Sequence, residues 1–281
     1  MKSSLPFLET MATQACNLSC QGCTNYSDLS YKGYVPWNTA KNWIDAWLEK
    51  INIETFGIIG GEPLLNPEVE NWLYGCRELM PDSQLRFTTN GLLIKSADNL
   101  LKILDDIGNI VFKITVHVDN TKLEDTIKEI FSLRDWQPVV EYGISRWKLD
   151  NGVRFQINRP EKFIKTFNGS YDTMMPYYSD PAAAFKLCVQ PDCPLLWNGR
   201  IYKCSTAGLL KDTLEKINPI TKKHWENFVD AGIGPDSPMS DILQFINNFG
   251  KPNQICAQCP ADHTAQILHK PTVLLKKYKP N

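Results

Sequence analysis

The chain has 281 residues with a formal net charge of −1, and 43% of its residues are hydrophobic. This length fits one large domain or two unequal ones, and so apolar a composition excludes a disordered chain. The near-neutral net charge indicates no basic surface of the kind that binds nucleic acid, so we predict no nucleic-acid partner. The N-terminus has no signal-peptide pattern and the sequence has no run of about eighteen apolar residues, so we predict a cytoplasmic protein with no membrane partner.

Short apolar runs alternate with amphipathic segments through the first half of the chain. The apolar runs predict strands at 7–13, 55–59, 84–91 and 109–120. The helical spacing of apolar residues predicts helices at 39–51, 66–80, 97–108 and 122–133. Four such repeats indicate an α/β fold of parallel βαβ units, in either a doubly wound sheet or a barrel. In both architectures ligands bind at the carboxyl ends of the strands, where the unusual residues of this sequence stand.

The regular alternation ends after Leu133. Two further apolar runs, 139–147 and 153–158, flank a turn sequence at 150–152, and we expect at least one of them to be another barrel strand. From about residue 170 the chain is richer in Pro, Tyr and Cys. We therefore predict two domains, residues 1–170 and residues 171–281.

Nine cysteines are distributed in groups along the chain. In a reducing cytosol such groups indicate metal ligands rather than disulfides, whereas the isolated Cys76 is interpreted as a core residue. The first group, Cys16, Cys20 and Cys23, places three thiols within eight residues. Three thiolates can hold three irons of a [4Fe–4S] cluster and leave the fourth iron open. A zinc site, closed by a fourth protein ligand from elsewhere, is the alternative.

Two motifs together resemble the signature of a known family. CNLSCQGC, from Cys16 to Cys23, follows the first predicted strand with C-x3-C-x2-C spacing, and GGEP, from Gly60 to Pro63, ends the second. In this order they resemble the radical S-adenosylmethionine (radical SAM) enzymes, over most of the first 160 residues. The resemblance implies a partial (β/α)6 TIM-like barrel that binds a [4Fe–4S] cluster and S-adenosyl-L-methionine (SAM). Reductive cleavage of SAM would give a 5′-deoxyadenosyl radical that takes a hydrogen atom from the substrate.

The resemblance also assigns residues to the SAM site. Gly60, Gly61 and Glu62 would meet the methionine amino group, with Glu62 adding charge or ordering the loop. Further matching positions lie at later strand ends, and they are Thr88, Thr89, Asn90, Thr115, His117, Asn158 and Arg159. Those on the fourth predicted strand would bind the ribose hydroxyls, and the last two would reach the ribose or the methionine carboxylate. The alternatives are a core role for the histidine and a solvated role for the arginine.

The sequence departs from the family pattern at one position. Relatives often have an aromatic residue just before the third cysteine, where this chain has Gly22. We expect the backbone to hold the adenine there, and the stacking surface to come from another residue, with Tyr26 as the candidate.

A second group of cysteines lies in the last third of the chain: Cys188, Cys193, Cys204, Cys256 and Cys259. The stretch NGRIYKC, a hairpin followed by a cysteine, resembles the auxiliary-cluster domains called twitch, with one [4Fe–4S] cluster, and SPASM, with two. Five cysteines suffice for one cluster, so the resemblance implies a small Cys-rich twitch-like domain. The last three are expected ligands, and Cys188 and Cys193 compete for the fourth place. The spare thiol is either a core residue or a catalytic hydrogen-atom donor, as in radical peptide epimerases. A zinc ribbon is the rival for the whole group.

The resemblance implies an oxidoreductase-type radical SAM enzyme that acts on a small molecule or a short peptide. Its electron donor would be a cytosolic protein such as flavodoxin or ferredoxin. The auxiliary [4Fe–4S] cluster would accept an electron from the substrate radical, giving net dehydrogenation. One alternative is a peptide-modifying enzyme, an epimerase or a crosslinking enzyme. The rival from another class is a non-catalytic zinc-binding protein.

Overall fold

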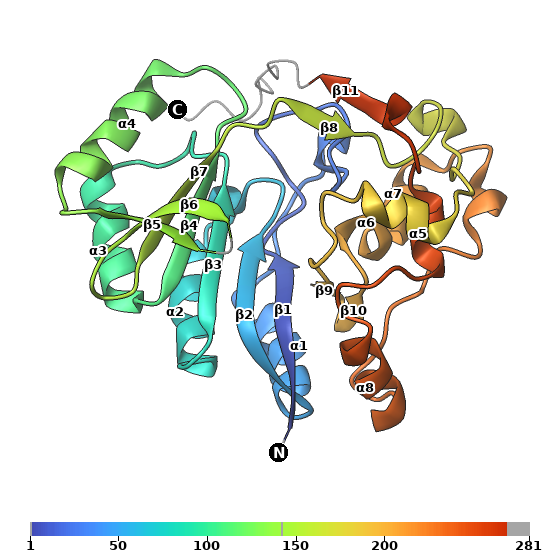
Figure 1. The fold of residues 1–281 in the computed structure, drawn as a ribbon, viewed down its shortest axis with the longest axis horizontal. Coiled ribbons are helices and arrows are strands. Elements are labelled where there is room, and N and C mark those ends of the chain that lie inside the picture. The colour runs from blue at the N-terminus through green and yellow to red at the C-terminus, as the bar shows by residue number, and fades with distance from the viewer. Residues whose placement is uncertain (1, 142, 269–281) are drawn as a thin grey trace.

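The computed structural model describes residues 2–141 and 143–268 as an α/β structure built on one large sheet (Figure 1). Five parallel strands, in the order β1-β2-β3-β4-β7, form the middle of this sheet. They are β1 (Ser3–Met11), β2 (Ile51–Ile59), β3 (Gln84–Thr89), β4 (Ile110–Thr115) and β7 (Arg154–Asn158). The helices that follow the first four strands are α1 (Trp37–Leu48), α2 (Val69–Leu79), α3 (Ala97–Ile107) and α4 (Thr121–Ser132). The four predicted βα repeats are confirmed.

The sheet has fewer βα units than the six expected. After α4 the chain forms an antiparallel hairpin, β5 (Gln137–Glu141) and β6 (Ile144–Lys148), and then returns as β7 beside β4. A hairpin reverses the chain without a crossover helix, so residues 2–141 and 143–268 contain four βα units and a fifth parallel strand. The next strand, β8 (Lys162–Ile164), pairs instead with β11 (Gln266–Leu268) in a small separate sheet. The run 153–158 is thus the further barrel strand.

The C-terminal part of the chain extends the large sheet beyond β1. Strand β9 (Leu195–Trp197) lies parallel to β1, and a hairpin joins it to β10 (Arg200–Tyr202). Asn198 and Gly199 both have positive φ, 49° and 78°, as in a two-residue type I′ turn, which confirms the predicted hairpin. The remaining α-helices are α5 (Pro181–Lys186), α6 (Ser205–Gly208), α7 (Leu210–Ile217) and α8 (Met239–Asn247). Short 3-10 turns occupy Ser27–Leu29, Pro63–Leu65, Tyr171–Thr173, Lys222–Trp225, Gln254–Gln258 and His263–Ala265.

The parallel strands have one apolar and one polar face. On the apolar face the ring centroids of Phe87 and Phe112 lie 5.4 Å apart, and those of Phe112 and Phe155 lie 5.8 Å apart. Phe155 also meets Phe131 of α4 edge-on at 5.5 Å, so this face packs against the helices. Because side chains alternate across a strand, the intervening positions point into the barrel. The site is built on that inner face.

Cys76 is a core residue, as expected from the sequence. This side chain, in α2, is fully buried in the main hydrophobic cluster. Gly108, with φ 58°, ends α3 at the predicted position. Across residues 2–141 and 143–268, no helix combines the length and the apolarity needed to cross a bilayer.

Phe112→Ala tests the aromatic stack between sheet and helices. We expect it to lower the free energy of unfolding by about 3–5 kcal/mol, because a cavity opens between two buried rings. Phe112→Leu keeps most of the side-chain volume, so it should lower the free energy of unfolding by clearly less. Urea unfolding of both variants measures this. A loss below about 1 kcal/mol for the alanine variant would mean that the stack contributes little.

Candidate functional site

The loop after β1 is fixed at its start by Thr13. Its Oγ1 accepts a hydrogen bond from Ala15 N at 2.9 Å and donates one to Gly33 O at 2.6 Å. Further along, Leu18 N lies 3.4 Å from the sulfur of Cys16. Backbone and side-chain hydrogen bonds therefore hold the loop in place within the described structure, and its cysteines are carried by an ordered chain.

The loop turns three thiols toward one space. Cys16 and Cys20 are buried, and Cys23 is half-buried. Burial, followed by the nearby Asp28 carboxylate, raises the pKa of Cys23 to about 12. Burial also raises the pKa of Cys16, and the Glu62 carboxylate adds to the effect. Cys16 and Cys23 would therefore give up their protons at neutral pH only to a bound cation.

The GGEP segment lies directly against the cysteine loop. Gly61 N donates to Thr13 O and Glu62 N donates to Ala15 O, both at 2.8 Å. A Cβ added at Gly61 would stand 2.3 Å from Ala15 O, and one at Gly60 would stand 2.7 Å from Thr13 O. Only glycine permits this approach of the two backbones. The two sequence motifs thus form one structural unit.

Glu62 is fully buried and ties the ends of two strands together. Its carboxylate accepts hydrogen bonds from Thr89 Oγ1 at 2.6 Å, Asn90 N at 2.7 Å and Leu64 N at 3.0 Å. Burial raises its pKa to about 7, and these three donors oppose the shift. Of the two roles expected for Glu62, ordering the loop is the one that these contacts perform. Thr89 is buried and holds this carboxylate through its hydroxyl group, and it also lines the cavity described next.

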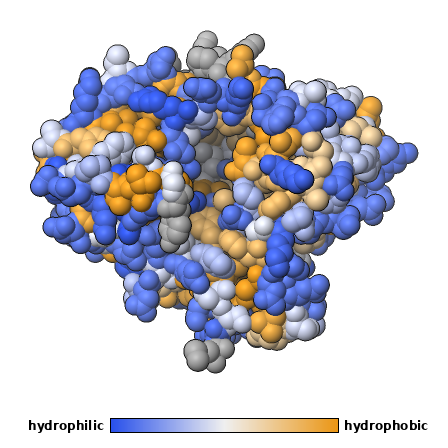
Figure 2. Space-filling model, viewed as in Figure 1, coloured by the Kyte–Doolittle hydropathy of each residue, from blue (hydrophilic) through white to orange (hydrophobic). Residues whose placement is uncertain are grey.

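A cavity of about 280 Å³ opens at the carboxyl ends of the strands. Ten of the residues expected at the SAM and cluster site line it: Cys16, Cys20, Cys23, Gly60, Gly61, Thr88, Thr89, Asn90, Thr115 and His117. Residues from the C-terminal part, among them Gln190 and Cys193, complete the wall. Figure 2 shows that this view of the molecule is hollowed between the barrel strands and the C-terminal elements.

Neither of the two residues expected to reach SAM from the end of β7, Asn158 and Arg159, lines this cavity. Arg159 forms two hydrogen bonds, of 2.8 and 3.0 Å, to the carboxylate of Glu124 on α4. It borders a separate surface cavity, with half of its side chain exposed. Asn158 is the last residue of β7, and its carbonyl accepts from Val116 N at 2.8 Å. Because β7 ends at this point, the next side chain turns toward α4.

The aromatic residue beside the cavity is Phe163, which the sequence reasoning missed. Its ring stacks on His117, with centroids 5.9 Å apart and planes at 29°. Tyr26, the expected candidate, is fully buried against Phe167 and does not line the cavity. At Gly22 a Cβ would stand 2.8 Å from Ile267 Cδ1. The glycine therefore leaves room for β11, the partner strand of the one that carries Phe163.

Three charged residues of the inner face were also missed: Glu9 of β1, Arg86 of β3 and Lys113 of β4 line the same cavity. Burial raises the pKa of Glu9 to about 7, and the charges of Arg86 and Lys113 oppose the rise. The signal was present in the strand QLRFTT, where polar residues occupy every second position. In a strand covered by helices on one side, such a pattern marks the barrel interior.

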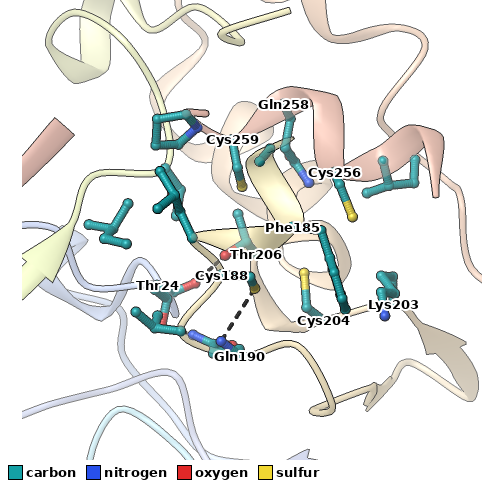
Figure 3. Close-up of a pocket in the computed structure, with 17 residues that line it drawn as sticks. Thr24, Phe185, Cys188, Gln190, Lys203, Cys204, Thr206, Cys256, Gln258 and Cys259 are labelled. Carbon is teal, nitrogen blue, oxygen red and sulfur yellow. Dashed lines mark hydrogen bonds between the residues drawn. The ribbon is translucent and has the colours of Figure 1, made fainter. Parts of the chain in front are cut away.

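Four of the five later cysteines surround a second, smaller cavity of about 50 Å³ (Figure 3). They are Cys188, Cys204, Cys256 and Cys259. Burial raises the pKa of Cys204 to about 12, and burial followed by the other three thiols raises that of Cys259. Cys193 does not line this cavity. Its charged neighbours are instead Glu9, Arg86, Lys113 and Asp192.

The donor set fits an iron–sulfur cluster, since four thiols influence one another around one apolar space. In residues 2–141 and 143–268, no three His, Cys, Asp or Glu side chains are arranged closely enough for a single metal ion. Such an ion needs sulfur ligands at about 2.3 Å.

Comparison with known proteins identifies the first part of the chain. Residues 11–142 match the family model described as the radical SAM superfamily. Over this stretch the chain is similar to the radical SAM superfamily. The match contains the cysteine loop and the GGEP segment.

The curated proteins to which this chain is similar include GTP 3′,8-cyclases. That of Sulfurimonas denitrificans is 29% identical over 265 residues, which cover 90% of this chain and 75% of the relative. That of Clostridium acetobutylicum is 26% identical over 143 residues, 49% of this chain and 42% of the relative. The chain thus spans less than half of the second relative. Among solved structures, BtrN in complex with AdoMet and 2-DOIA has a TM-score of 0.51 at 14% identity, covering 92% of this chain and 94% of BtrN. This likeness concerns the fold alone.

Gly61→Ala tests the contact between the two motifs. We expect its methyl group to push the GGEP segment off the cysteine loop, and the anaerobically reconstituted protein to lose most of its SAM affinity. Gly33→Ala is the control, because an added methyl there would meet nothing within 4 Å and costs only the strain of φ +82°. Equilibrium binding of SAM measures both. Unchanged affinity in Gly61→Ala would contradict the close packing.

Proposed function

We propose that this protein is a radical SAM enzyme that abstracts a hydrogen atom from a small-molecule or short-peptide substrate. The observation that carries the proposal is the single cavity shared by Cys16, Cys20 and Cys23, the GGEP glycines and the ends of β3 and β4. Three thiols suit a [4Fe–4S] cluster with one iron left for the methionine group of SAM. When bound, this pair supplies the 5′-deoxyadenosyl radical.

The chain itself positions and shields that chemistry. Gly60 and Gly61 bring backbone groups to the cavity wall, and Asn25 Nδ2 already donates to Gly60 O at 3.1 Å. Thr88, Thr115 and His117 offer polar groups at the strand ends, suited to ribose hydroxyls. The ring of Phe163 covers one side and would exclude water from a reactive radical.

The four-cysteine group would hold an auxiliary [4Fe–4S] cluster in a twitch-like domain. Four thiolates saturate the irons of a cubic cluster, so this cluster would pass electrons rather than ligate substrate. Thr24, Val189 and Gln190 line both cavities, which supports a short path between them. Gln190 links the walls, since its N–H lies 3.3 Å from the sulfur of Cys188 and its side chain accepts from Ser205 Oγ at 2.8 Å. The net reaction would be a two-electron oxidation of the substrate.

A cytosolic setting is part of the proposal. The grouped cysteines suit a reducing compartment, where thiols remain available to bind a metal. A small redox protein such as flavodoxin or ferredoxin would supply the electron that cleaves SAM. The division into two domains at residue 170 is likewise part of the proposal.

Cys20→Ala tests the assignment of the first cluster. Anaerobic reconstitution of the wild type should give a brown protein with about eight irons per chain that forms 5′-deoxyadenosine from SAM and dithionite. The variant should lose that activity and about four irons, because one of three ligands is gone. A colourless protein that binds zinc at both sites would instead favour the non-catalytic alternative.

A second candidate reaction is radical epimerisation or crosslinking of a peptide. The position of Cys193 favours this reaction, because Cys193 lines the proposed SAM cavity and not the four-cysteine cavity. A thiol there could return a hydrogen atom to a substrate radical.

Matched serine variants separate the two later cysteines. We expect Cys188→Ser to lower the iron content by about four atoms per chain, because it removes a ligand of the auxiliary cluster. Cys193→Ser should keep the full iron content and should still form 5′-deoxyadenosine. Iron analysis and the deoxyadenosine assay measure both. Equal iron loss in the two variants would reverse the assignment of the spare thiol.

A further inference from the structure

We propose that Arg86 and Lys113 bind an anionic group of the substrate, a carboxylate or a phosphate, beside Glu9 inside the barrel. This inference rests on the proposed function, because it takes the cavity to be the substrate site. It adds the chemical class that the substrate has to carry.

Strand register brings the three residues to one side of the sheet. Glu9 is paired with Gly57, and Gly57 with Arg86, on adjacent parallel strands. A Cβ at Gly57 would stand only 2.8 Å from the Cβ of Glu9, so the glycine leaves open the position between the two side chains. Lys113 is paired with Thr88, two residues beyond Arg86 on the same face. All three charges therefore face the same cavity.

No salt bridge within the described residues neutralises this group. Glu9 is only 6% exposed, and its carboxylate interacts electrostatically with Arg86 and Lys113 without forming a hydrogen bond or a salt bridge to either one. The Arg86 guanidinium lies 4.6 Å from the ring centroid of Phe7, and neither it nor Lys113 forms an ion pair within residues 2–141 and 143–268. The Lys113 ammonium donates to the side-chain amide oxygen of Asn158 at 3.1 Å. Two half-buried cations thus face one carboxylate, and an anionic ligand would balance the excess positive charge.

A neighbouring pair of arginines shows the contrast. Arg146 and Arg154 share the carboxylate of Glu141, at 2.9 and 2.8 Å. Those cations are structural, because each has its counter-ion. Glu9 is a counter-charge to Arg86 and Lys113 but forms no salt bridge with either one along the described chain, so one positive charge remains available to a ligand.

Glu9, Arg86 and Lys113 lie deeper in the barrel than the residues proposed to contact SAM. Arg86 precedes Thr88 by two residues and Lys113 precedes Thr115 by two, so both stand before the strand ends. Arg86 and Cys193 also border a third cavity, of about 430 Å³, lined further by Arg146 and Asp192. The substrate would enter the 280 Å³ cavity with its anion on the guanidinium, whose planar donors match carboxylate and phosphate oxygens.

Anion binding to the reconstituted full-length protein tests this. Anaerobic calorimetry with inorganic pyrophosphate, in one arm, and malonate, in the other, distinguishes the two anion types. We expect saturable binding of at least one of them, weakened about tenfold or more in Arg86→Gln and in Lys113→Gln, because a charged hydrogen bond is lost. Arg134→Gln is the matched control, since that arginine pairs with Asp105 on the surface. It should bind as the wild type does.

Two readouts keep this inference separate from the proposed function. SAM affinity and uncoupled formation of 5′-deoxyadenosine should stay at wild-type levels in Arg86→Gln and Lys113→Gln. The inference is overturned if neither anion binds, if both variants bind as tightly as the wild type, or if they lose SAM instead. A wild type that binds the anion but never cleaves SAM would refute the proposed function and leave the anion site standing.

Discussion

The contact on which the site depends is the one between two backbones, the cysteine loop and the GGEP segment. Two hydrogen bonds of 2.8 Å join them, at Gly61 and Glu62, and side chains at the glycines would collide with the loop. The buried carboxylate of Glu62 then fixes the end of β3 through Thr89 and Asn90. Since this acid joins the ends of β2 and β3, and backbone hydrogen bonds join the same segment to the loop after β1, the geometry of the cavity is set largely before any cofactor arrives.

The division of the sheet into an apolar and a polar face explains how one fold carries both stability and chemistry. The stacked rings of Phe87, Phe112 and Phe155 bury the outer face against the helices. The inner face is free to carry Glu9 and Arg86, because it needs no helix to cover it. Burying such groups costs free energy, and the packed outer face offsets that cost.

The C-terminal part completes the site by joining the sheet itself. Strand β9 pairs with the free edge of β1, and β11 pairs with β8. These pairings carry the later cysteines to the barrel and set Phe163 against His117. Edge pairing thus closes the cavity with segments that are distant in sequence, and it also covers an edge that would otherwise be exposed.

The sequence by itself determined what depends on short-range pattern: the four βα repeats, the first three cysteines, the glycines of GGEP and the hairpin at Asn198. These features follow from local spacing and from backbone conformations that few residues allow. Only the tertiary structure separated Cys188 from Cys193, because they stand five residues apart in the chain yet line different cavities. It also placed Phe163, and not Tyr26, beside His117 of the first cavity, and it turned Arg159 toward Glu124, since strand register and the end of β7 set those directions. The convergence of Glu9, Arg86 and Lys113 likewise required the pairing of three strands, which no local pattern encodes.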